Sequence, residues 1–207
     1  MKTTFHFLKN ALLVLTVVVF TSGCQVIMKF KYGIKQPHEE TPEKLISFLH
    51  HEKFPDTNLF LFKDSAAYIK ALNNNMIRKN LLSHMIFDRN GALLERDTTQ
   101  CQWAGYYFIK QLSPDSLYPT DTGITLNDVI SEIKPLVPAV DTGIKNTFPD
   151  FTMIILWGKF LGKYNQRLFI LADAVQTNTA AKIHLIYLNI DMQKNWHLNR
   201  KQKLMIR

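Results

Sequence analysis

The residues best able to do chemistry in this 207-residue chain are its two cysteines, Cys24 and Cys101. A thiolate is the nucleophile of thiol oxidoreductases and peroxidases, and it needs a cation or a helix N-terminus nearby to lower its pKa. Cys101 lies at the start of an expected helix, and Arg96 is close to it in sequence. A single-cysteine oxidoreductase or peroxidase that uses Cys101 is therefore one hypothesis, and a buried, unreactive thiol is the alternative.

Two Asp-Thr-Gly triplets, at 121–123 and 141–143, have the sequence that aspartic proteases use for two aspartates sharing a proton. In those enzymes each triplet follows an apolar strand in a separate half or subunit. Here both triplets lie in one stretch, 113–150, which holds five of the eight prolines. Turn formation explains them better, so we do not expect a protease.

Histidines are the remaining candidates for metal ligands. His50 and His51 are adjacent, with His38 and Glu39 upstream. Neighbouring residues on a helix point about 100° apart and cannot easily share one ion, so an exposed helix end is the better interpretation. The other histidines, His84, His184 and His197, are scattered and lack a nearby carboxylate pattern. We expect no metal and no cofactor.

The N-terminus has the three parts of a secretory signal. Lys2 and Lys9 form a positive region, 11–20 is an apolar run, and small residues follow. Ten helical residues rise only about 15 Å, too short to span roughly 30 Å of hydrocarbon. Residues 21–24, Thr-Ser-Gly-Cys, resemble the lipobox of bacterial lipoproteins, although the position of Thr21 is usually aliphatic.

This resemblance implies that residues 1–23 are removed and that Cys24 is acylated, so that the mature protein binds the lipid bilayer. Cys101 would then have no intramolecular disulfide partner. The location implied is the bacterial cell envelope, and Gln25, which lacks acidic character, favours the outer over the inner membrane by analogy.

The chain carries a formal net charge of +8, and 46% of its residues are hydrophobic. The basic residues are dispersed, with a mild cluster at Arg200, Lys201, Lys203 and Arg207. Charge alone is non-specific, so we interpret this cluster as a solvated terminus and expect no nucleic-acid partner.

Apolar periodicity and turn signals predict a tether over 24–41, followed by a single domain over 42–207 in which 113–150 is an irregular connection. Thr41 and Pro42 are typical of a helix start. Trp103, Tyr106 and Tyr107 would share one helix face as core. The predicted helices cover 42–51, 64–80, 100–112, 126–133 and 165–177, and the predicted strands cover 58–62, 152–157 and 182–189, with a hairpin at Asn90-Gly91.

Residues 151–195 resemble the first β-α-β unit of thioredoxin-superfamily proteins, above all the thiol-disulfide reductases of bacterial envelopes. In that family an apolar strand ends in Trp, as at Trp157 here, and a Cys-Gly-Pro-Cys turn and a helix follow. By this alignment Leu161 and Tyr164 replace the redox cysteines, Gly162 matches, and Lys163 replaces proline. The resemblance therefore implies the fold without the thiol chemistry, because neither side chain can form a thiolate.

The hairpin also resembles the family's Asp-x-x-Gly hairpin, with Asp88 and Gly91 matching, while Leu82 or Ser83 replaces its cis-proline. Here the hairpin precedes the strand-Trp unit, so either the elements are permuted or one likeness is coincidental. We expect a thioredoxin-like layered α/β fold with a central mixed sheet flanked by helices. The expected function is that of an envelope lipoprotein that binds an unidentified envelope protein as an accessory. A ligand-binding or sensor domain is the remaining alternative.

Overall fold

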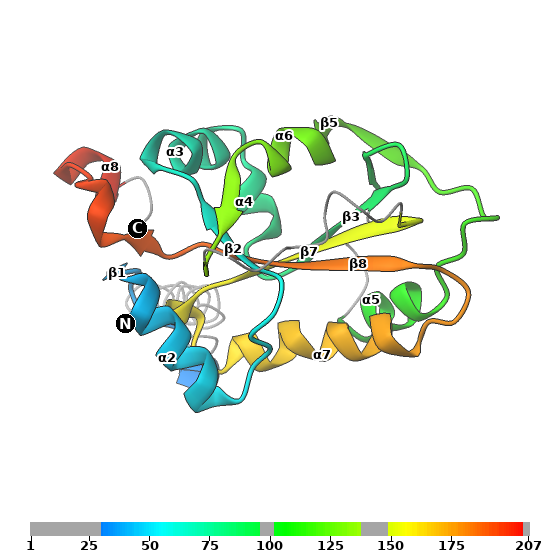
Figure 1. Ribbon diagram of the computed structural model, residues 1–207, viewed down its shortest axis with the longest axis horizontal. Helices are drawn as coiled ribbons and strands as arrows, with labels where there is room; N and C mark the ends of the chain where they lie inside the picture. Colours follow the sequence, from blue (N-terminus) through cyan, green and yellow to red (C-terminus); the bar gives the residue numbers. More distant parts are fainter. Residues whose placement is uncertain (1–29, 96–101, 138–148, 205–207) are drawn as a thin grey trace, which may run out of the picture.

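The computed structural model describes residues 30–95, 102–137 and 149–204. A central sheet separates two layers of helices (Figure 1): α3, α4 and α6 cover one face, and α5 and α7 cover the other. The layered α/β architecture with a mixed sheet confirms the expected fold class.

Seven strands form the main sheet in the order β5-β4-β3-β7-β8-β2-β6. The pairs β7·β8 and β8·β2 are parallel, and the other neighbours are antiparallel. The strand bounds are β2 Leu59–Phe62, β3 His84–Asp88, β4 Ala92–Leu94, β5 Thr120–Thr125, β6 Ile133–Pro135, β7 Phe151–Trp157 and β8 Ile183–Asn189. A separate parallel pair joins β1, Glu39–Glu40, to β9, Met192–Gln193.

The helices connect these strands around the core. Their bounds are α2 Pro42–Glu52, α3 Ser65–Asn73, α4 Met76–Asn80, α5 Gln102–Lys110, α6 Leu126–Ile130, α7 Tyr164–Thr177 and α8 Arg200–Leu204. Every residue of β7 is buried, as expected for a central strand covered on both faces. Trp157 at its end is fully buried, and its ring lies near those of Phe48 and Phe169.

The arrangement is consistent with a thioredoxin-like layered α/β fold. The unit β7-α7-β8 is the expected β-α-β unit, with all seven residues of β7 in parallel register with β8. The β3–β4 hairpin pairs antiparallel with β7, and α5 follows the hairpin and packs beside α7. The hairpin and α5 therefore lie beside the β-α-β unit in space and precede it in the chain.

The single helix expected over 64–80 is wrong. It is divided into α3 and α4 at Asn74 and Asn75, and Asn75 has a left-handed φ of 60°. Asparagine tolerates this region better than most residues, and the Asn74 side chain accepts a hydrogen bond from the Met76 N–H.

The irregular connection expected over 113–150 is also wrong in part. It contains β5 and β6, which are the two edge strands of the sheet, with α6 between them. The predicted helix over 126–133 ends at Ile130, and the chain then enters β6. Thr125 and Asp128 form a capping box at the start of α6.

The hairpin is confirmed, but its turn is longer than a two-residue one. Residues 89–91 form the loop, and only Gly91 has a positive φ, of 79°. The Asp88 carboxylate accepts hydrogen bonds from the N–H groups of Asn90 and Ala92. Asp88 therefore has a structural role in this turn.

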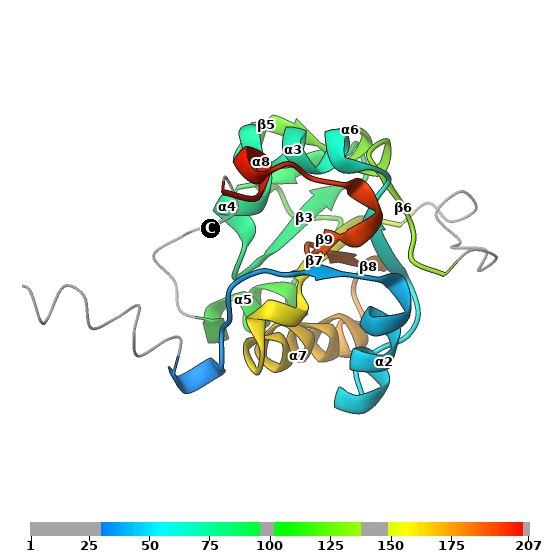
Figure 2. The same cartoon turned by 90° about the vertical axis from the view of Figure 1, so that its left-hand side faces the viewer.

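The domain begins earlier than the expected boundary at residue 42. Residues 30–38, here called the N-terminal strap, pack on the folded domain, and β1 follows directly. Figure 2 shows this segment passing the start of α7 and then crossing below β9 toward α2. For this part of the chain the expected tether is therefore wrong.

Candidate functional site

The β7–α7 turn, residues 158–163, lies where the resemblance places a redox site. It follows central strand β7 and precedes the crossover helix α7, with a short 3-10 helix at Lys159–Leu161. Asn165 is fully buried and fixes the turn: its side-chain amide donates to the carbonyls of Gly158 and Gly162, at 2.9 and 3.0 Å. Its Oδ1 also accepts from the Gly158 N–H at 3.3 Å.

The positions aligned with the redox cysteines are both closed to solvent. Leu161 is 1% exposed and Tyr164 is 9% exposed. The Tyr164 hydroxyl donates to the carbonyl of Leu82 at 3.1 Å, in the loop before β3 where the family has its cis-proline. The structure thus brings Tyr164 and the start of the hairpin strand together, with a phenol-to-carbonyl hydrogen bond between them.

The strap covers this turn. The Lys163 N–H donates to the Tyr32 carbonyl and the Lys35 N–H donates to the Phe160 carbonyl, both at 2.8 Å. The ring of Tyr32, 7% exposed, packs edge to face against Tyr164, and the Arg167 guanidinium lies 4.8 Å from its centroid.

Gly162 makes this close approach possible. Its φ is +54°, and a Cβ at this position would lie 2.5 Å from the Tyr32 carbonyl oxygen and 2.7 Å from that of Gly33. Both distances are shorter than van der Waals contact. A residue with a side chain at position 162 would therefore clash with the packed strap.

A buried polar cluster lies beside the turn at the end of β8. The Asp191 carboxylate accepts from the Lys159 N–H at 2.7 Å and from the Asn189 amide at 2.9 Å. Burial, with a smaller effect of the nearby Glu40 carboxylate, raises the pKa of Asp191 to about 6 against the lowering effect of these hydrogen bonds. Glu40 in turn pairs with the Lys159 ammonium at 3.1 Å.

Two atoms of this cluster are buried with no hydrogen-bond partner in the described part of the chain: Asp191 Oδ1 and Gln193 Oε1. A carboxyl group with a pKa near 6 can take up or release a proton near neutral pH. Among the described residues of the turn, no nucleophile lies beside the Asp191 carboxyl group. The role that the structure shows for this polar cluster is to hold the turn against the end of β8.

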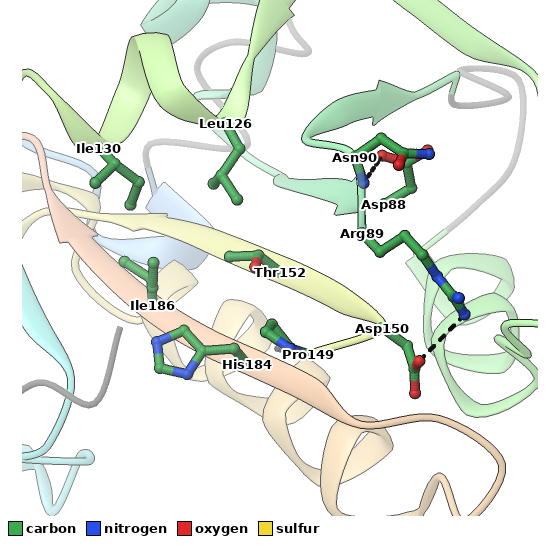
Figure 3. Close-up of a pocket in the computed structure, with 10 residues that line it drawn as sticks. All are labelled: Asp88, Arg89, Asn90, Leu126, Ile130, Pro149, Asp150, Thr152, His184 and Ile186. Atoms are coloured by element: carbon green, nitrogen blue, oxygen red, sulfur yellow. Dashed lines mark hydrogen bonds and ion pairs between the residues drawn. The ribbon is translucent and has the colours of Figure 1, made fainter. Parts of the chain in front are cut away.

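A cavity of about 330 Å³ lies at the opposite end of the sheet, between α6 and the starts of β7 and β8. Figure 3 shows Leu126 and Ile130 of α6 facing Ile186 and Thr152 of the sheet. His184 also lines it; burial lowers the pKa of this imidazole.

The rim of this cavity is polar. The Arg89 guanidinium pairs with the Asp150 carboxylate at 3.4 Å (Figure 3). Asp88 and Asn90 of the hairpin loop complete the rim. The arrangement could hold a small apolar molecule, and its charged groups are already paired or used in the hairpin turn.

The other predicted site residues are dispersed. His38, His50 and His51 are exposed, and Asp121 accepts a hydrogen bond from the Gly123 N–H within β5. Among the described residues, no three His, Cys, Asp or Glu side chains are grouped so that they could hold a metal ion. Cys24, Cys101 and the triplet at 141–143 lie outside the described residues.

The expected aromatic core on α5 is wrong for one member, since Tyr107 is 56% exposed. Tyr106 is partly buried, and Ile109 of this helix is fully buried. In the described ranges no helix has the length and apolarity needed to cross a bilayer.

Comparison with protein-family models, with curated proteins and with solved structures finds no match for this chain.

Three residues that hold or cover the turn were not predicted from the sequence: Tyr32, Asn165 and Asp191. Asp191 could have been suspected from the Asn-Ile-Asp segment at the end of a predicted strand, where polar side chains often meet in α/β sheets. No local signal marks Tyr32, because its burial depends on a contact with a residue more than 130 positions later.

Proposed function

We propose that this chain is a lipid-anchored lipoprotein of the bacterial cell envelope whose thioredoxin-like domain acts by binding a partner, without thiol-disulfide exchange. The observation that carries the proposal is the closed β7–α7 turn. Leu161 and Tyr164, which the resemblance aligns with the redox cysteines, are buried there, and the strap lies over the turn.

The chemistry of the turn supports a binding role. Thiol exchange needs an accessible thiolate and a resolving thiol, and an aliphatic and a phenolic side chain provide neither. The strap adds a second obstacle, because a disulfide substrate would have to displace Tyr32 from Tyr164 to reach the turn. Asn165 and Asp191 hold the turn in one closed conformation, which favours binding over thiol exchange as the role of the domain.

Anchoring is the second part of the proposal and rests on the lipobox-like Thr21–Cys24 segment. Mass spectrometry of the processed chain from a bacterial envelope should find an acylated N-terminal Cys24. Cys24→Ala should release the protein from the membrane fraction, and Cys101→Ala should leave it bound. An unmodified N-terminus at another residue would contradict the anchor.

An assay of disulfide reduction tests the proposal that the domain does not catalyse thiol-disulfide exchange. The full chain and its Cys101→Ser variant should reduce a disulfide substrate no faster than buffer. Robust reduction by the Cys101→Ser variant would contradict the proposal. Reduction by the full chain that Cys101→Ser abolishes would favour the single-cysteine oxidoreductase instead.

The cavity under α6 favours one second candidate, a ligand-binding domain. Its volume of about 330 Å³ is at the lower end of the roughly 300–1,000 Å³ typical of small-molecule sites. Ile130→Trp should fill it, so any small molecule that raises the melting temperature of the wild type should lose this effect in the variant. A stabilising compound that is unaffected by Ile130→Trp would place its site elsewhere.

A further inference from the structure

The end of the domain that carries the β7–α7 turn is assembled from three segments distant in sequence. These are the strap, residues 76–82 with α4, and residues 158–167 with the start of α7. The strap meets the turn through the paired backbone hydrogen bonds described above, and Tyr164 joins residues 76–82 through the Leu82 carbonyl at 3.1 Å.

These three segments carry only one sign of charge. They contain no Asp or Glu and seven basic side chains: Lys31, Lys35, Arg78, Lys79, Lys159, Lys163 and Arg167. Glu40 of β1 pairs with one of them, Lys159. Lys31, Lys35, Lys79 and Lys163 are all exposed.

Exposed apolar side chains accompany these cations. Phe30 is 86% exposed at the start of the strap, and Leu82 is 37% exposed beside Tyr164. Aromatic and basic side chains together are typical of surfaces that lie at the boundary between water and lipid headgroups.

The same end is closest to the proposed anchor. Six peptide bonds separate Cys24 from Phe30. A chain of that length reaches at most about 20 Å, so acylation of Cys24 would hold the strap near the headgroups. Because the strap is bound to the turn, the whole cationic end would be held there.

We propose that the cationic end, defined by Lys31, Lys35, Lys79 and Lys163, lies on the bilayer and binds the phosphates of anionic phospholipids. This inference rests on the proposed acylation of Cys24. The strap thereby fixes the orientation of the domain, with the turn toward the membrane. The β3–β4 hairpin and the α6 cavity, at the opposite end of the sheet, then face away from it.

Lysine footprinting tests this surface in the full chain. The protein is reconstituted into vesicles of phosphatidylcholine alone or with about a third of phosphatidylglycerol, and an acetylating reagent is added. Lys31, Lys35, Lys79 and Lys163 should react at least about fivefold more slowly in the anionic vesicles, and added salt should reverse this. Lys110 and Lys182 are exposed at the opposite end and are the internal controls.

A charge variant supplies the second measurement. Lys31→Glu with Lys163→Glu should abolish the protection of Lys35 and Lys79, while Lys110→Glu with Lys182→Glu should preserve it. Equal reactivity in both kinds of vesicle, or equal protection of Lys110 and Lys182, would overturn the assignment.

Flotation with neutral vesicles separates this inference from the anchor. Acylated protein should float with phosphatidylcholine whether or not the cations bind. Failure to float contradicts the acylation, and flotation without selective lysine protection contradicts only the membrane-binding surface.

Discussion

Tyr32 and Tyr164 pack edge to face, with ring centroids 5.2 Å apart and planes at 85°. Tyr164 is the first residue of α7, and Tyr32 comes from the N-terminal strap, which precedes α2. The contact therefore joins the N-terminal strap to the turn and closes it.

Gly162→Ala should loosen the strap. The new Cβ would meet the carbonyl oxygens of Tyr32 and Gly33. Either the strap must move away or the backbone around residue 162 must adopt a strained conformation. We expect the free energy of unfolding, measured by urea denaturation, to fall by about 2–4 kcal/mol.

Gly33→Ala is the matched control for this change. Gly33 has a similar φ of +63°, but a Cβ there meets nothing within 4 Å. It should therefore show the backbone cost alone, about 1 kcal/mol. Equal losses in the two variants would show that the close approach at Gly162 does not matter.

Tyr32→Ala should weaken strap docking directly. The variant removes a buried ring, its contact with Tyr164 and its cation–π contact with Arg167. We expect a loss of about 2–4 kcal/mol in the free energy of unfolding and faster proteolysis within the strap. Phe30→Ala, at an 86% exposed position, should change neither quantity in solution.

Asn165→Ala should destabilise the turn, because it leaves the buried carbonyls of Gly158 and Gly162 without their side-chain donor. The expected loss is about 2–4 kcal/mol by chemical denaturation. Gln166→Ala, at the exposed neighbouring position, should cost less than about 0.5 kcal/mol. Similar values for the two variants would contradict the role given to Asn165.

Asp191 should make stability depend on pH. Its folded pKa of about 6 lies above the unfolded value of about 3.9, so its contribution is fully present below pH 4 and is lost as pH rises through 6. Asp191→Asn removes this titration, and the stability of the variant relative to wild type should rise by about 3 kcal/mol between pH 4 and pH 8.

Urea denaturation at several pH values measures this difference. Asp115→Asn, an exposed carboxylate on the other side of the molecule, should give a nearly constant difference over the same range. A constant difference for Asp191→Asn as well would mean that the carboxyl group titrates normally in the folded protein.

The sequence was sufficient to predict the centre of this fold. The apolar run ending at Trp157, the helix after it and the next strand define the β-α-β unit, because buried parallel strands have strong local signals. The hairpin was equally clear from Asn90-Gly91 flanked by apolar runs. Leu161 lies in the turn after β7, and Tyr164 is the first residue of α7.

The edges of the fold had no comparable signal. Strand β5, Thr-Asp-Thr-Gly-Ile-Thr, is largely polar, and β6 is a three-residue strand ending in Pro135. Such strands are typical of sheet edges and form through pairing with their neighbours, so local periodicity misses them. The strap was missed for a related reason, since its packing depends on Tyr164 and Gly162, far along the chain.

Hydrogen exchange at the Lys35 amide tests most directly whether the strap closes the turn. This N–H donates to the Phe160 carbonyl at 2.8 Å, whereas in a free tether it would exchange like an unstructured peptide. We expect the Lys35 amide to exchange at least about a hundredfold more slowly than an unstructured peptide, and this protection to be lost in Gly162→Ala. Exchange of Lys35 at the unstructured rate in the wild-type protein would contradict it.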